Sequence, residues 1–150
     1  MPHKSYLMTK GRDTLSNYYT IRMRGYLIDN MRMRELQGFC GQYDKKVEEL
    51  KSIYSLSSPP FEAPVQGGTT SNPTEQKAAR ALKLKADIDV IDECIKTACH
   101  GEEGMVDILK NAVTHNLSYG KLGYVPESVN KFGLRRRRFY YLLDKRLNER

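Results

Sequence analysis

Four consecutive arginines, Arg135 to Arg138, stand directly before an aromatic and leucine-rich run, Phe139 to Leu143, near the end of the sequence. Each arginine carries a permanent positive charge and a planar fork of N–H donors that matches phosphate groups. The apolar run must pack, so the arginines are held at a fixed place on a folded surface. A fixed basic surface is what a phosphate backbone binds, and the pattern therefore predicts nucleic-acid binding.

Helical phase assigns different roles to the side chains of this segment. We predict a helix over residues 127–147 with an apolar stripe turned toward the core. The stripe consists of Val129, Phe132, Arg136, Phe139, Leu143 and Leu147. Because Arg136 falls on this stripe, we interpret it as a residue with a buried stem whose guanidinium reaches solvent.

The opposite side of the same predicted helix carries the candidate contacts with DNA. It shows Glu127, Asn130, Lys131, Leu134, Arg135 and Arg138. Asn130 is of a type that pairs with adenine, whereas Lys131 and Arg135 suit guanine or phosphate. Ser128, near the helix start, can bond a phosphate through its hydroxyl beside free backbone N–H groups. The cations assigned to backbone phosphates are Arg137, Arg138, Lys145 and Arg146.

The elements expected before this helix have the spacing of a helix-turn-helix. Apolar residues between Met105 and Val113 recur at helical spacing, a very short helix is predicted over residues 119–122, and a turn follows over 123–126. In a helix-turn-helix the second helix lies in the major groove and reads bases from its N-terminal part. We therefore expect double-stranded DNA as the partner. RNA or an acidic protein would also suit the arginine run.

Two apolar seams with heptad spacing predict a helical hairpin ahead of this unit. The first seam is Leu36, Cys40, Tyr43, Val47, Leu50 and Tyr54. The second is Ala81, Leu84, Ile88, Ile91, Ile95 and Ala98. Such helices either fold back on each other as an antiparallel hairpin or pair with a second chain as a homodimer. The sequence leaves both arrangements open.

The fold class predicted is all-α, because no segment shows a strand pattern. The expected parts are an N-terminal helical region 1–56, a linker 57–72, a long helix 73–100 that pairs with the N-terminal region, and a helix-turn-helix-like unit 104–150. Residues 12–34 are also predicted to be helical, with a break at Gly25. The linker combines paired prolines and glycines, and it ends in a helix start where Asn72 can cap, Pro73 fits the first position and Glu75 completes a capping box.

Charge is distributed unevenly over the 150 residues, whose net charge is +7. Residues 1–35 carry 7 basic and 3 acidic side chains, residues 36–130 carry 10 and 13, and residues 131–150 carry 8 and 2. The basic ends favour a localised anionic partner. No stretch approaches the ~20 apolar residues that span a bilayer, and no signal peptide is apparent. The three cysteines form no Cys-x-x-Cys pair, so we expect a cytoplasmic protein with free thiols.

Three segments together resemble a known family. They are Gln66 to Thr74 leading into an Ala-rich helix, Asn111 to Tyr119 followed by Leu122, and Val125-Pro126 followed by Phe132, the arginine run and Phe139 to Leu143. Their order resembles small phage and prophage regulators of Gram-positive bacteria, of the ArpU and RinA late-gene activator type. The resemblance covers about residues 65–145. It implies a DNA-binding regulator of phage late or packaging genes in a bacterial host, with a C-terminal unit akin to region 4 of sigma factors. RNA polymerase is a further partner that this implies.

Other function classes have less support from the residues. His3, His100 and His115 lie far apart and show no catalytic spacing, so we expect no enzyme and no cofactor. Cys94, Cys99 and His100 lack a fourth ligand with standard spacing, so we expect no metal. Two alternatives to the regulator remain. One is an oligomeric DNA-packaging protein of the small-terminase kind, and the other is a protein-interaction module with a basic helix.

Overall fold

The computed structural model describes residues 28–56 and 72–150. In that part of the chain every regular element is a helix, so the fold is all-α, as predicted. The elements are α3 (Asn30–Gly41), α4 (Tyr43–Leu56), α5 (Pro73–Ala98), α6 (Glu103–Thr114), the 3₁₀ helix η1 (Tyr119–Lys121) and α7 (Val129–Asn148). The linker prediction, the Gly25 break and most of the helix predicted over residues 12–34 lie outside the described residues.

Helix α5, with 26 residues, is the central helix against which α4, α6 and α7 pack. Its start follows from the sequence. The side chain of Asn72 accepts a hydrogen bond from the Thr74 N–H at 3.1 Å, and Pro73 occupies the first helical position. Both features stabilise a helix N-terminus. All six residues of the second seam, from Ala81 to Ala98, are buried. The heptad spacing therefore identified the inner face of α5 from Ala81 to its end at Ala98, whereas residues 73–80 are exposed.

The first seam folds back onto α5 within the same chain, but it is divided between two helices. The chain breaks its helix at Gln42, between α3 and α4. Gly41, at the end of α3, has a low helix propensity and favours a break there. Leu36, Cys40 and Tyr43 are buried, whereas Tyr54 is 59% exposed. The seam therefore fades toward the end of α4.

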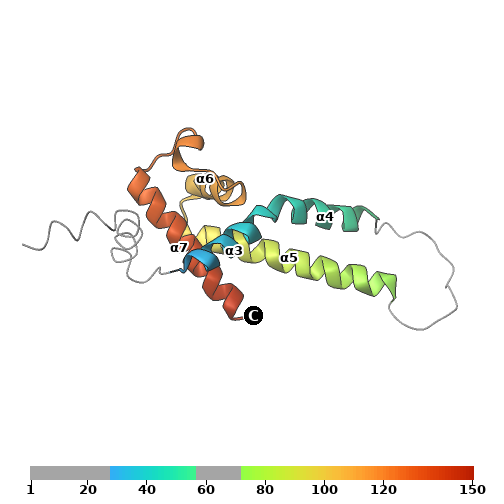
Figure 1. The fold of residues 1–150 in the computed structure, drawn as a ribbon. Coiled ribbons are helices and arrows are strands. Elements are labelled where there is room, and N and C mark those ends of the chain that lie inside the picture. The colour runs from blue at the N-terminus through green and yellow to red at the C-terminus, as the bar shows by residue number, and fades with distance from the viewer. Residues whose placement is uncertain (1–27, 57–71) are drawn as a thin grey trace, which may run out of the picture.

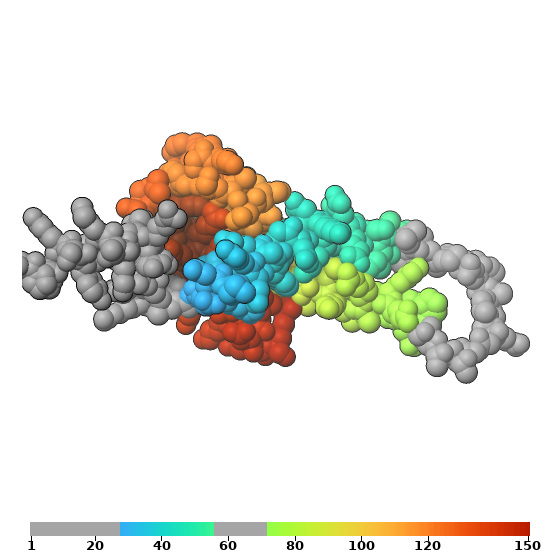
Figure 2. Space-filling view, in the orientation of Figure 1, coloured from blue at the N-terminus to red at the C-terminus, as the bar shows by residue number. Residues whose placement is uncertain are grey.

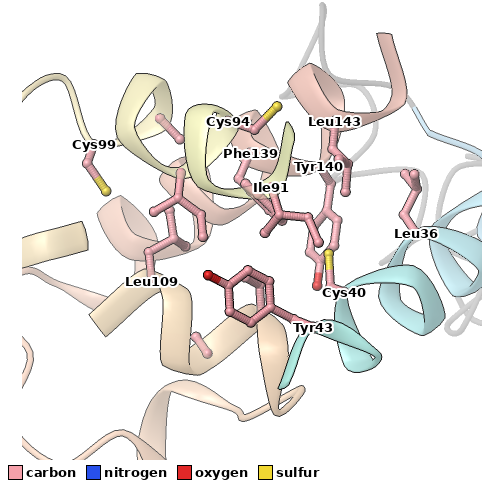
Figure 3. Packing of buried hydrophobic residues seen from close by; sticks show 14 of the residues in the cluster. Leu36, Cys40, Tyr43, Ile91, Cys94, Cys99, Leu109, Phe139, Tyr140 and Leu143 are labelled. Atoms are coloured by element: carbon pink, nitrogen blue, oxygen red, sulfur yellow. The ribbon is translucent and has the colours of Figure 1, made fainter. Parts of the chain in front are cut away.

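The described chain has a thick end and a thin arm (Figures 1 and 2). In the arm, α4 lies alongside the first half of α5. In the thick end, α3, α6 and α7 pack around the second half of α5. Figure 3 shows side chains from these four helices meeting in one cluster, with Ile91 of α5, Leu109 of α6, and Phe139, Tyr140 and Leu143 of α7. The large residues of this core are almost fully shielded from water.

A polar contact fixes α4 and α6 against α5 at the edge of the core. The Tyr43 hydroxyl donates to the Asp92 carboxylate at 2.9 Å, and the Lys110 ammonium lies 3.0 Å from the same carboxylate. The Lys110 ammonium also lies 4.6 Å from the centroid of the Tyr43 ring. Burial by itself lowers the pKa of Lys110, but the contacts with Tyr43 and Asp92 outweigh it and raise that pKa. This polar contact therefore links α4, α5 and α6 at the edge of the core.

The order of elements predicted for residues 104–148 is found, with one difference in kind. Helix α6, η1, a turn and α7 follow one another. The short element η1 is a single 3₁₀ turn of three residues, whereas a helix-turn-helix pairs two α-helices across a short turn. Gly120 lies inside η1, and Gly123 follows it with a φ of 74°. Glycine disfavours a continued α-helix and readily adopts positive φ, which explains why the element is so short.

Candidate nucleic-acid interface

Helix α7 begins two residues later than predicted, and Ser128 is its N-cap. The Ser128 hydroxyl oxygen accepts a hydrogen bond from the backbone N–H of Lys131 at 3.2 Å. This bond satisfies one of the donors that a helix start leaves unpaired. The oxygen of the hydroxyl is thus engaged as an acceptor in starting the helix, and its O–H is the group that could donate to a phosphate.

The inner face of α7 is close to the predicted stripe. Phe132, Phe139 and Leu143 are buried, and Tyr140 joins them with its ring 5.0 Å from that of Phe139. The prediction was wrong for Val129, which is 59% exposed. Burial starts one turn later, with Phe132. The centroid of its ring lies 5.8 Å from that of Tyr119 in η1.

Arg135 is buried, and the prediction that it faces a DNA groove was wrong. Its Nε donates to the Glu127 carboxylate at 3.1 Å, and its Nη2 donates to the other oxygen of the same carboxylate. Its Nη1 donates to the Ala98 carbonyl at 3.1 Å, and Nη2 reaches Glu102 at 3.3 Å. The hydrogen bonds that Arg135 donates to Glu127 raise the pKa of the guanidinium. All the strong acceptors that surround Arg135 are therefore supplied by the protein itself.

Helical spacing explains this burial. Arg135 stands three residues after Phe132 and four before Phe139, and both of these are core residues. Positions i, i+3 and i+7 share one face of a helix. Glu127 was also misplaced, because it was expected on the outer side and is buried as the partner of Arg135. A charge enters a protein interior only with a partner, so the two must be interpreted together.

Arg136 has the position that its phase predicted. It is partly buried, and its guanidinium donates to the backbone carbonyl of Leu117 and, at 3.3 Å, to the Asn116 side-chain oxygen. Asn116 has a φ of 50° and lies just beyond the end of α6. Arg136 thus links α7 to the segment that follows α6, and its guanidinium donates to groups of the protein itself.

The outer face of α7 carries an uncharged ridge. At 3.6 residues per turn, Asn130, Leu134 and Tyr141 lie along one line on the side opposite the core. Asn130 is exposed, Leu134 is 46% exposed and Tyr141 is partly exposed. We refer to these three residues as the uncharged ridge.

Cations flank the uncharged ridge on both sides. Lys131, Arg138 and Lys145 lie on one flank, and Arg137 lies on the other, by the same helical phase. Lys131 and Lys145 are exposed, and Arg137 and Arg138 are partly buried. This places four of the seven predicted contact residues as cations on the solvent side of α7, together with Asn130.

The acidic residues nearest this face are occupied elsewhere. Glu127 pairs with buried Arg135, although its carboxylate also lies 3.9 Å from the Lys131 ammonium. Asp144, the one acidic residue within α7, binds the Nε of Arg32 at 2.6 Å. Both carboxylates are therefore engaged in contacts with the fold, while Lys131 and Lys145 remain exposed to solvent.

Charged side chains at the C-terminal end of α7 and just after it bind carboxylates of α5. Arg146, which we expected to bind a phosphate, donates to the Glu93 carboxylate of α5. Arg150 binds Asp87 at 2.7 Å, and Lys46 binds the same carboxylate at 2.9 Å. Burial by itself raises the pKa of Asp87, but the hydrogen bonds from Arg150 and Lys46 outweigh it and lower that pKa. These contacts anchor the C-terminal end of the helix.

Two further side chains, His100 and Tyr124, were not predicted from the sequence to take part in this region. His100, which follows α5 with a φ of 50°, accepts a hydrogen bond at Nε2 from Arg138. Tyr124, in the turn before α7, is 85% exposed. No spacing signal links His100 to Arg138, since 38 residues separate them. A tyrosine next to Gly123 in a turn, by contrast, could have been flagged as exposed.

Within the described residues, the structure holds no group of three or more His, Cys, Asp or Glu side chains arranged for a metal ion. All three cysteines are free and buried. In the same part of the chain, no helix is long and apolar enough to cross a membrane. Comparison with protein-family models found no match, and neither did comparison with curated proteins or with solved structures.

Proposed function

We propose that this protein binds double-stranded DNA through the outer face of α7 and reads its sequence as a transcriptional regulator of phage late or packaging genes. The observation that supports binding is the outer face itself, where an uncharged ridge has three cations on one flank and Arg137 on the other, while the nearby carboxylates are engaged by the fold. The resemblance to ArpU and RinA regulators supports the assignment to phage gene control.

The dimensions and chemistry of this face suit the major groove. A helix of 20 residues is about 30 Å long, and the groove admits one α-helix. With the uncharged ridge toward the base edges, Lys131 and Arg138 lie toward one strand and Arg137 toward the other. Phosphate contacts on both sides orient a helix, and the side chains between them read bases.

Burial of Arg135 changes the expected base preference. The uncharged ridge presents the amide of Asn130, which suits adenine, and the methyl groups of Leu134, which suit the thymine methyl. The arginine that we had assigned to guanine is instead held by Glu127. We therefore expect the positions under the N-terminal half of α7 to be A·T pairs.

The proposal is tested by equilibrium binding of the full chain to labelled duplex DNA over a range of salt. If the four cations together neutralise three to four phosphates, log K should fall against log salt with a slope of roughly −2.7 to −3.6, or about 10²-fold between 50 and 200 mM. Arg137→Ala should reduce the slope by about one. Lys83→Ala removes an exposed charge from α5 and is the matched control. Binding that barely responds to salt would contradict the proposal.

Sequence reading requires a second experiment. Selection of bound sequences from random duplexes should enrich A·T pairs, and Asn130→Ala should narrow the gap between selected and random DNA by about 1–3 kcal/mol. If the protein binds duplexes but enriches no sequence, the proposal that it is a sequence-specific regulator is refuted, and only non-specific DNA binding remains.

One observation favours a DNA-packaging protein as the second candidate. The arm of α4 and α5 extends away from the core as a helical hairpin (Figure 1), and such a hairpin suits contact between subunits. A ring of many subunits in solution light scattering would favour packaging, whereas a monomer or dimer would favour the regulator.

A further inference from the structure

A small cleft opens beside the outer face of α7, where the end of α5 meets the N-terminal half of α7. Its volume is about 260 Å³, and it is lined by Ala98, His100, Lys131, Leu134, Arg135 and Arg138. Two segments that are about 30 residues apart in sequence build it together. Every ionisable group in this lining is a base.

The carboxylates next to the cleft are paired with Arg135. Arg135 lies buried at the cleft and binds Glu127, which is buried, and Glu102, whose side chain is 55% exposed. The Lys131 side chain is 66% exposed, with its ammonium 3.9 Å from the Glu127 carboxylate, and Arg138 is partly exposed. Lys131 and Arg138 therefore face solvent beside carboxylates that Arg135 already binds.

His100 fixes the guanidinium of Arg138 at the cleft. Its Nε2 accepts a hydrogen bond from Arg138 Nη1, which leaves the other N–H donors of the guanidinium free to bind a ligand. The left-handed backbone of His100, with a φ of 50°, is followed by Gly101 at 78°. This tight turn brings the imidazole from the end of α5 to α7.

We propose that this cleft seats one backbone phosphate of the bound DNA, held jointly by Lys131 and Arg138, with His100 as the residue that positions Arg138. The proposal rests on the DNA binding proposed above and adds where one strand is clamped. A phosphate offers oxygen acceptors to both the ammonium and the guanidinium.

The test compares two double variants of equal charge in duplex binding by the full chain. Lys131→Ala with Arg138→Ala removes the cleft cations, and Lys83→Ala with Lys85→Ala removes two exposed cations of α5. One lost phosphate contact should weaken binding about tenfold at 0.1 M salt. Since the two cations share one phosphate, the salt slope of the cleft variant should fall by about one rather than two. The control variant should change little.

The role of His100 is tested by His100→Asn, because asparagine tolerates positive φ. This change should weaken binding in the wild-type background and have no effect in an Arg138→Ala background, because His100 acts through Arg138. Equal losses in both backgrounds would overturn the positioning role. Circular dichroism of each variant checks that it is folded, and Lys131→Gln and Arg138→Gln serve if the double variant is not.

The outcomes separate this proposal from the one on which it rests. If the wild-type chain binds no duplex, DNA binding itself is refuted, and the phosphate seat with it. If the wild-type chain binds and the cleft variant matches the control variant, only the phosphate seat is refuted. A slope that falls by two would also refute it, because each cation would then hold its own phosphate.

Discussion

Replacing Arg135 with alanine should destabilise the protein far more than replacing its neighbours in the arginine run. The side chains of Arg135 and Glu127 are only 6% and 3% exposed. Removing the guanidinium leaves the Glu127 carboxylate buried with the Lys131 ammonium, 3.9 Å away, as its remaining basic neighbour in the structure. It also removes the donor that binds the Ala98 carbonyl. Breaking one partner of a buried ion pair typically costs about 3–5 kcal/mol.

The measurement is chemical and thermal unfolding followed by circular dichroism. A loss of about 3–5 kcal/mol corresponds to a fall in Tm of about 6–20 °C for a chain of this size. A second variant separates the lost pair from lost volume. Arg135→Met together with Glu127→Leu removes both charges, and such replacements are often neutral or stabilising. We expect the double variant to recover most of the stability that Arg135→Ala loses.

The same substitutions distinguish a structural arginine from a base-reading one. At a temperature where the double variant is folded, its DNA affinity and salt slope should match the wild type, whereas Arg137→Ala should reduce the slope. An Arg135→Ala protein that is within about 0.5 kcal/mol of wild-type stability, a typical surface effect, would refute the burial argument. Loss of sequence preference in the stable double variant would indicate that Arg135 contacts bases in the DNA groove after all.

Three further predictions concern the scaffold. Phe139→Ala should lose about 3–5 kcal/mol in chemical unfolding, because the ring is fully buried, and a near-neutral result would contradict the inward orientation of this face of α7. Tyr140→Phe should be neutral or stabilising, since the buried hydroxyl has no hydrogen-bond partner among the described residues. Asp87→Asn should lose about 2–3 kcal/mol at neutral pH. Because the folded pKa of Asp87 is lowered, this difference should shrink as pH falls below the ordinary value of ~3.9 and vanish below the folded pKa. A difference that persists in stronger acid would exclude the ion pairs as its cause. Burial raises the pKa of Cys40 to about 12 and that of Cys94 to about 11, so both thiols should resist alkylation at pH 8 until the protein is unfolded, and rapid labelling of the native protein would show that the core opens.

The helical elements could be predicted from local sequence because their causes are local. The cap at Asn72, the proline at position 73 and the heptad spacing of α5 act within a few residues of one another, and the structure confirms all three. The division of the first seam at Gln42 was less visible, since a low-propensity glycine only lowers the stability of a helix and packing decides whether it breaks.

The candidate site was predicted less well because it depends on pairings between distant segments. Helical phase placed Phe132 and Phe139 inside and Asn130 outside correctly. It failed for Arg135, because a polar residue on a mixed face was assumed to be exposed. Only the arrival of Ala98 and Glu102 from the end of α5 and its following loop shows that Arg135 has acceptors enough to be buried.

The sequence by itself determined an all-helical chain, the inner faces of its two longest helices, and a basic helix anchored by aromatic residues, because propensity and periodicity act over a few turns. The tertiary structure alone decided which charges remain outside. Arg135 turns inward to Glu127, and Arg146 turns to Glu93. Each choice depends on a partner brought close by packing, since a buried or partly buried charge is stable only where distant segments supply its counter-charge or hydrogen bonds.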